Sequence, residues 1–174
     1  DASNNLKRYF NRYFTPNGLA FSPCNKKMFF SDTNELIQKI WICDYDLEHG
    51  QPSRSKLFFD CKQVLGRPDG ATTDTDGCYW FAAYDGYQII RLTPTGKVDK
   101  IINLPLRYPT KVAFGGKDLK TLYVTSASPT TQNRIQPGLE GQILAITNSG
   151  AQGVLQPPFN GKKLSGQIAI KLNS

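Results

Sequence analysis

Short runs of apolar residues recur along most of the chain, and Gly, Pro, Asn and Asp separate one run from the next. Two examples are KMFFSD at 27–32 and TLYVTS at 121–126, which contain aromatic and β-branched residues among polar ones. Such runs are typical of strands, because successive side chains of a strand point to opposite faces of its sheet. The apolar spacing of a helix, at i, i+3 and i+4, is not sustained over any window of about a dozen residues. The pattern therefore predicts an all-β protein.

The predicted strands fall into a repeat. One unit reads PNGLAFSPCNKKMFFSDT, then KIWICDYDLEHG, then SRSKLFFD; the next opens with PDGATTDTDGCYWFAAYDG, and a third with PTKVAFGGKDLKTLYVTSAS. Each unit begins with proline and a small polar residue, at Asn17, Asp69 and Thr110. A period of about 40 to 50 residues, with tight turns such as TPTG and TNSG, is typical of four-stranded antiparallel β-propeller blades.

The repeat predicts a single partial propeller domain that supplies about three blades. The expected blade units are 17–68, 69–109 and 110–158, with 1–16 as the end of a preceding blade and 159–174 as a tail or closing strand. The third unit ends in a weaker strand signal, AQGVLQP. Propellers close with about four to eight blades, so three blades make roughly half a ring. We expect a missing N-terminal half of the propeller, or a second half-ring, to complete it, and the isolated half to be inactive.

Composition and charge exclude several functional classes. Lys and Arg number 21 against 14 Asp and Glu, a net charge of +7, but the basic residues are scattered and form no stripe beside base-stacking aromatic residues. We therefore expect no nucleic-acid partner. No apolar run approaches the roughly 20 residues that span a bilayer, and the opening DASNNLKRYF lacks the apolar segment of a signal peptide. We expect no membrane partner and a cytoplasmic location.

Other reactive residues form no recognised motif. The cysteines show no C-x-x-C spacing, and two of them lie in apolar runs, so reduced thiols are favoured over disulfides. They are Cys24, Cys43, Cys61 and Cys78. His49 is the only histidine and lies in the predicted hairpin turn DLEHG, so a Ser-His-Asp triad has no base. The aspartates complete no D-x-D-x-D-G-x5-E calcium loop.

Asn17 and Asp69 are the best candidates for chemistry. Each follows a proline and precedes a glycine at the start of a predicted inner strand, where the loops of a propeller converge on one mouth of its channel. An amide oxygen and a carboxylate are hard donors, suited to calcium, magnesium or manganese. Asn-Gly and Asp-Gly are also common turn dipeptides, so a purely structural role stays open. The matched position in the repeat is what points to a shared site.

Four motifs, in this order, resemble the gluconolactonase/regucalcin family, also called the senescence-marker or luciferin-regenerating type. They are PNGLAFSP, IWICDYDLEHG, GRPDGATTDTDGCYWFA and PTKVAFGGKDLKTLYVTSA, and the resemblance runs from about Tyr13 to Ser128. It implies the C-terminal half of a six-bladed propeller that holds one divalent metal ion in its channel. Many members of the family hydrolyse sugar lactones.

The resemblance also implies roles for the candidate residues. Asn17 and Asp69 match two metal ligands of the family, and Asp69 matches the proposed general base for the attacking water. The third family ligand, a glutamate near the start of the full-length chain, has no counterpart here. The expected function is a metal-dependent hydrolase of sugar lactones that uses one calcium, zinc, magnesium or manganese ion. The alternative is a metal-binding or scaffold propeller that keeps the motifs without turnover.

Overall fold

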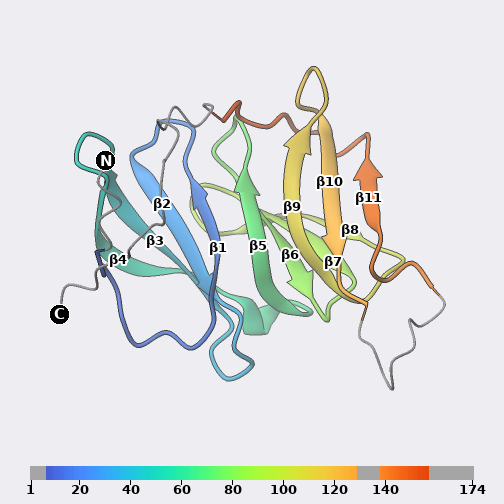
Figure 1. The fold of residues 1–174 in the computed structure, drawn as a ribbon, viewed down its shortest axis with the longest axis horizontal. Helices are drawn as coiled ribbons and strands as arrows, with labels where there is room; N and C mark the ends of the chain where they lie inside the picture. The colour runs from blue at the N-terminus through green and yellow to red at the C-terminus, as the bar shows by residue number, and fades with distance from the viewer. Residues whose placement is uncertain (1–6, 129–137, 157–174) are drawn as a thin grey trace, which may run out of the picture.

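The computed structural model describes residues 7–128 and 138–156 of the chain. Within them lie eleven strands and one short 3-10 turn, η1 (Cys61–Gln63), arranged as three antiparallel sheets (Figure 1). The strands are β1 (Pro16–Phe21), β2 (Lys27–Asp32), β3 (Lys39–Asp46), β4 (Gln51–Asp60), β5 (Arg67–Thr73), β6 (Tyr79–Tyr84), β7 (Gln88–Leu92), β8 (Val98–Asn103), β9 (Pro109–Gly115), β10 (Thr121–Ser126) and β11 (Ile143–Ile146). The prediction of an all-β protein is confirmed.

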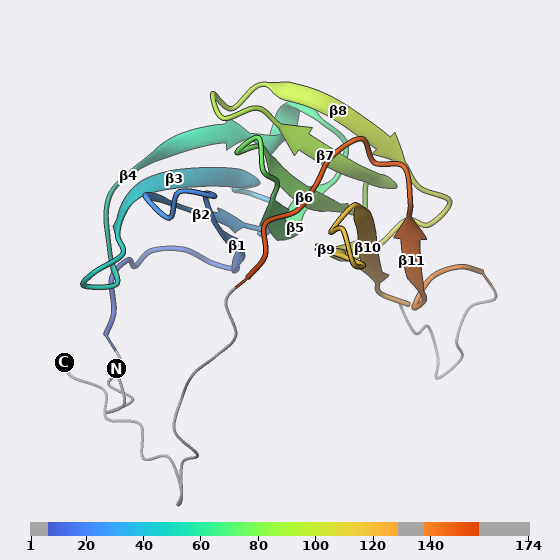
Figure 2. The ribbon, with the colours of Figure 1, turned by 90° about the horizontal axis from the view of Figure 1, so that it is seen from above.

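The sheets stand side by side in an arc. Their strand orders are β1-β2-β3-β4, β5-β6-β7-β8 and β11-β10-β9, so each sheet is a simple up-and-down meander. Figure 2 shows β1, β5 and β9 along the concave side of the arc and β4 and β8 toward its convex side. The three inner strands run in the same direction, so their starts lie along the same edge of the three sheets (Figure 1). This is the arrangement of consecutive propeller blades.

The strand β6 of the central sheet is buried on both faces. Alternate residues of β6 point to opposite sides, so Tyr79 and Phe81 pack in the core shared with the first sheet, while Trp80 packs in the core shared with the third. All three side chains have no exposed surface. Burial on both faces explains why the run CYWFAA is continuously apolar rather than alternating. Phe29 and Ile40 of the first sheet also belong to the first core.

Two predicted strands are not formed. Residues 7–15, expected to end a preceding blade, carry no strand; the N–H groups of Phe14 and Thr15 are bound by the Asp32 side chain at the end of β2 and not by the backbone of another strand. Residues 151–156 do not pair with β11, so the third sheet has three strands. Gly153 instead makes an isolated bridge with Asp74 and donates its N–H to the Leu119 carbonyl at 2.8 Å. The Gln152 carbonyl accepts the Thr75 N–H at 2.8 Å, so both of these backbone hydrogen bonds go to neighbouring turns and not to β11.

The division into the blade units 17–68, 69–109 and 110–158 stays a prediction, and the expected tail or closing strand at 159–174 lies outside the described residues. The part of the chain that the structure describes contains no helix long and apolar enough to cross a membrane. The four cysteines are free thiols; Cys24 is exposed and the other three are buried.

Candidate functional site

Asn17 and Asp69 meet at the starts of neighbouring inner strands. The Asn17 amide nitrogen donates a hydrogen bond to Asp69 Oδ1, although the two residues are 52 positions apart. Asn17 is the second residue of β1 and Asp69 the third residue of β5, and both side chains are half-buried. The structure thus brings together the two residues that the repeat singles out. Their roles as metal ligands stay a prediction.

Irregular strand pairing turns the backbone at the matched positions. Pairing with the second strand of the sheet shifts between Asn17 and Ala20 in the first sheet, and between Pro68 and Ala71 in the second. In each case two residues of the inner strand face one residue of its neighbour, which is the arrangement of a β-bulge. Bulges redirect side chains and are common beside functional sites. The sequence contains the Asn-Gly and Asp-Gly pairs but does not predict that they form bulges.

Thr110, which occupies the matching position in the third unit, does not add a metal-ligand oxygen beside Asn17 and Asp69. The Thr110 hydroxyl lies 2.8 Å from the Thr125 hydroxyl within its own sheet. The next residue, Lys111, extends instead toward the second sheet, and its ammonium donates to the Ala71 carbonyl of β5.

Gly18 fixes the path of the chain at Asn17. Its φ of 60° lies in the left-handed region, and a Cβ atom there would come within 2.4 Å of the Tyr79 hydroxyl oxygen and 2.6 Å of Ser31 Oγ. The same Tyr79 hydroxyl donates to the Gly18 carbonyl at 2.7 Å. The glycine therefore lets the start of β1 lie directly against the buried tyrosine of the next sheet.

We expect Gly18→Ala to lower the free energy of unfolding by about 2–4 kcal/mol, because it adds overpacking to left-handed strain. Gly50→Ala is the matched control: its φ is 64°, but the nearest atom to an added Cβ is the Tyr45 hydroxyl at 3.7 Å. Denaturant unfolding of the two variants separates packing from backbone strain. Equal losses would show that the contact with Tyr79 contributes nothing.

The electrostatic surroundings of Asp69 are mixed. Partial burial raises the pKa of the Asp69 carboxyl, and this effect is opposed by the Asn17 amide, the Gly70 N–H and the nearby cations Arg67 and Lys111. The Arg67 guanidinium lies over the Tyr84 ring, 5.1 Å from its centroid. Removal from water lowers the pKa of Lys111, while the Asp69 carboxylate acts in the opposite direction. Asp69 is thus a partly desolvated carboxylate between two basic side chains.

The pair fits a hard divalent cation as part of a larger ligand set. A carboxylate and an amide oxygen are the donor types that calcium, magnesium and manganese prefer, and turning the Asn17 amide would present its oxygen beside Asp69. Residues 7–128 and 138–156 contain no group of three or more His, Cys, Asp or Glu side chains that could hold a metal. Since calcium takes six to eight oxygens, the other ligands have to come from water, substrate or residues beyond the described ones.

The other sequence candidates lie away from this pair. His49 is exposed in the hairpin between β3 and β4, with its ring nitrogen 2.8 Å from Asp46. Asp74 is fully buried and accepts hydrogen bonds from the Trp80 indole and from Arg91. Asp32 is buried as well and accepts the backbone N–H groups of the segment that enters β1. These carboxylates have structural partners.

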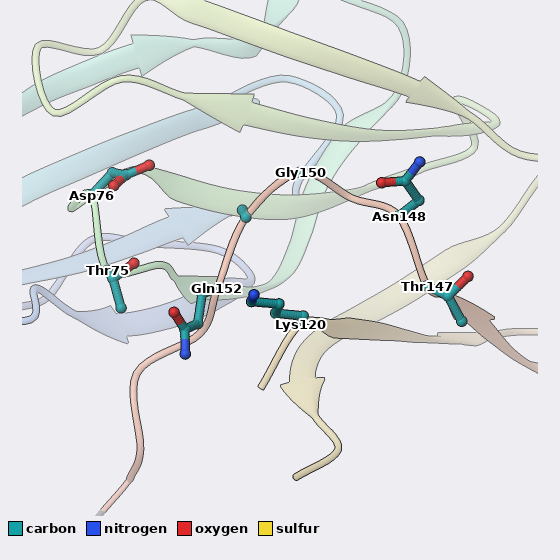
Figure 3. A pocket seen from close by; sticks show the side chains of 8 residues that line it. Thr75, Asp76, Lys120, Thr147, Asn148, Gly150 and Gln152 are labelled. Atoms are coloured by element: carbon teal, nitrogen blue, oxygen red, sulfur yellow. The ribbon is translucent and has the colours of Figure 1, made fainter. Parts of the chain in front are cut away.

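A hollow lies at the far ends of the inner strands, away from the ends that carry Asn17 and Asp69. Figure 3 shows Thr75 and Asp76 on one side of it, Thr147 and Asn148 on the other, and Lys120 between them. The hollow has a volume of about 370 Å³. Thr75 follows the end of β5, so the length of that strand, roughly 20 Å, separates the hollow from Asp69. It is not part of the Asn17–Asp69 site.

Comparison with known proteins gives consistent results. Residues 1–128 match the sequence model of the family described as SMP-30/Gluconolactonase/LRE-like region. A 6-deoxy-6-sulfogluconolactonase from Pseudomonas putida is 41% identical over 148 residues, which are 83% of this chain and 50% of that protein. The chain spans about half the length of the curated relatives it matches.

Solved structures resemble the fold. A luciferin-regenerating enzyme superposes with a TM-score of 0.78 at 30% identity, covering 88% of this chain and 51% of that one. A regucalcin from Agrobacterium tumefaciens str. C58, described as a calcium-binding protein, superposes with a TM-score of 0.77 at 25% identity, covering 87% of this chain and 51% of that one. These likenesses confirm the propeller fold expected from the repeat, with the three sheets as its blades.

Proposed function

Because the chain belongs to the SMP-30/gluconolactonase/LRE-like family, as its motifs indicate, we propose that it contributes part of the site of a metal-dependent hydrolase of sugar lactones. The observation that supports this best is the contact between Asn17 and Asp69 at the starts of adjacent inner strands. Their oxygens belong to the donor types that hold a divalent cation, whether calcium, zinc, magnesium or manganese. A metal bound there would polarise the lactone carbonyl.

Asp69 is the proposed general base. It takes a proton from water as the water oxygen adds to the lactone carbonyl carbon. The ring C–O ester bond then breaks, and its oxygen leaves as a hydroxyl group after it gains a proton, so the product is the open hydroxy acid. A carboxyl whose pKa is raised by burial accepts a proton at lower cost than one in water, which favours this role. Asn17 orients the Asp69 carboxylate through its amide hydrogen bond, and its amide oxygen is the second protein ligand of the proposed metal site.

The substrate is a small sugar lactone. The P. putida relative is named for a sulfonated gluconolactone, so acidic as well as neutral lactones belong in the substrate panel. We propose that further blades, from more of the polypeptide or from a second half-ring, enclose the channel and supply the remaining ligands, since three blades leave it open. The cytoplasmic location stays a prediction, supported by the four free thiols.

The test is metal-dependent hydrolysis of lactones by the full-length protein. We expect a chelator to abolish hydrolysis and an added divalent metal to restore it. Asn17→Ala should raise the metal concentration needed for half-maximal rate about 10-fold, which is the effect of losing one neutral ligand, and excess metal should partly rescue it. Activity against free metal concentration measures both effects.

Asn148→Ala, an exposed amide in the hollow at the far strand ends, is the matched control and should leave the metal response unchanged. Hydrolysis that is insensitive to the chelator would contradict the metal-dependent mechanism. Metal binding without turnover of any lactone would support the alternative, a metal-binding or scaffold propeller.

A further inference from the structure

Lys111 extends across the inner strands from the third blade to the second. Its ammonium donates to the Ala71 carbonyl of β5, two residues beyond Asp69. The stem of the side chain crosses Gly70 closely, since a Cβ atom at Gly70 would lie 2.5 Å from Lys111 Cδ. The lack of a side chain at Gly70 is therefore what allows this lysine to lie beside Asp69.

The lysine lines a cavity of about 260 Å³ between the three inner strands. β1 contributes Leu19 and Phe21 to its wall, β5 contributes Thr72, and β9 contributes Lys111 and Ala113. Among the described residues that line it there is no carboxylate, and Lys111 is their single charged group. The volume is close to the lower end of the range for small-molecule pockets, about 300 Å³.

The charge balance around Asp69 favours a negatively charged ligand. Two cations, Arg67 and Lys111, lie near enough to affect the one carboxylate, so the local charge is positive before any metal binds. A positive cavity wall with no carboxylate attracts anions.

The hydrogen bond to the Ala71 carbonyl does not by itself explain why a charged side chain stands at position 111. An ammonium has three donors, and the Ala71 carbonyl accepts one of them. Although part of its side chain is removed from water, Lys111 still has exposed surface along the inner strands, and water there can satisfy a carbonyl without a charged side chain. The remaining donors stay available to a ligand in the cavity.

We propose that Lys111 binds an anionic substituent of the substrate, a phosphate, sulfonate or carboxylate group on the sugar, and so makes the site selective for acidic sugar lactones. This inference rests on the proposed lactone hydrolysis for the identity of the substrate. The ammonium donates to the oxyanion while the lactone ring lies toward Asn17 and Asp69. The lysine is a binding residue and takes no part in the proton transfers.

The test compares gluconolactone with its phosphorylated form, phosphogluconolactone, as substrates of the full-length protein. Lys111→Met keeps the stem that crosses Gly70 and removes the charge. For phosphogluconolactone we expect this variant to raise KM about 10-fold, the effect of losing one charge-assisted hydrogen bond, with kcat changed less than about 2-fold. Loss of the cation near Asp69 acts on both substrates alike, so the ratio of kcat/KM for phosphogluconolactone to kcat/KM for gluconolactone is the measure, and it should fall about 10-fold.

Lys117→Met, in the exposed turn between β9 and β10, removes the same charge at the other end of the strands and should leave both substrates unaffected. Lys111→Arg keeps the charge and should retain most of the preference for the phosphorylated lactone. If Lys111→Met changes the KM values of both lactones equally, Lys111 does not recognise the substituent, and the inference is wrong.

Calorimetry separates this inference from the proposed function, because it needs no turnover. In the parent protein, phosphogluconate should bind more tightly than gluconate, and Lys111→Met should remove that difference. If neither lactone is hydrolysed and the difference is lost in Lys111→Met, the proposed function fails and the anion site stands. If the difference persists in Lys111→Met, the anion site is overturned whatever the activity.

Discussion

Asp69→Asn is expected to lower the rate of lactone hydrolysis by the full-length protein at least about 100-fold, because one change removes both the base and a ligand charge. The fold should survive, since the new side chain has nearly the same shape and can still pair with the Asn17 amide. Steady-state rates at saturating metal measure the loss. A similar midpoint of thermal unfolding in parent and variant would show that the loss is chemical.

Glu48→Gln is the control for charge alone, since Glu48 lies in the exposed hairpin between β3 and β4. It should leave the rate unchanged. Excess metal should not rescue Asp69→Asn, in contrast to Asn17→Ala, because no cation replaces a proton acceptor. Near-normal turnover in Asp69→Asn would place the base elsewhere in the site.

Asp74→Ala is expected to cost about 3–5 kcal/mol of folding free energy, the range for removing one partner of a buried ion pair. The carboxylate is fully buried and accepts the Trp80 indole N–H at 2.7 Å and the Arg91 Nε–H at 2.8 Å. It also accepts the backbone N–H groups of Asp76 and Cys78, each at 3.0 Å. Its removal leaves these donors without a partner beside a cavity. Denaturant unfolding measures the loss.

Asp76→Ala is the matched comparison. Asp76 contacts the same guanidinium, with Arg91 Nη2 at 2.7 Å, but its side chain is 69% exposed. Exposed ion pairs contribute at most about 1 kcal/mol, so the loss should be small. Equal losses in the two variants would contradict the assignment of the stability to the buried carboxylate.

The sequence is informative wherever a property repeats at short range. The alternation of apolar residues predicts the strands, and the matched Pro-Asn-Gly and Pro-Asp-Gly motifs predict that Asn17 and Asp69 come together, because equivalent positions in successive blades occupy the same end of the channel. The burial of strand β6 can also be predicted from the sequence, since both of its faces are apolar.

The rest depends on contacts between distant residues. Asp74 belongs to a run, DTDG, that reads as an exposed turn, and its burial follows from Trp80 and Arg91 folding over it. Lys111 carries no signal of its own, because its position depends on the missing side chain at Gly70 in another blade. The segment 151–156 resembles a weak strand, but its backbone hydrogen bonds go to the turns at Thr75 and Leu119 and not to β11.

The contact between Asn17 and Asp69 joins two separate sheets through residues 52 positions apart in the chain. Such a site does not exist in the unfolded polypeptide, where a loop of that length separates the two side chains. Any ligand that both residues hold therefore binds the folded arrangement alone and adds RT ln(1 + [L]/Kd) to its stability. A ligand there is also a clamp between blades, so its occupancy sets how readily the first sheet separates from the second.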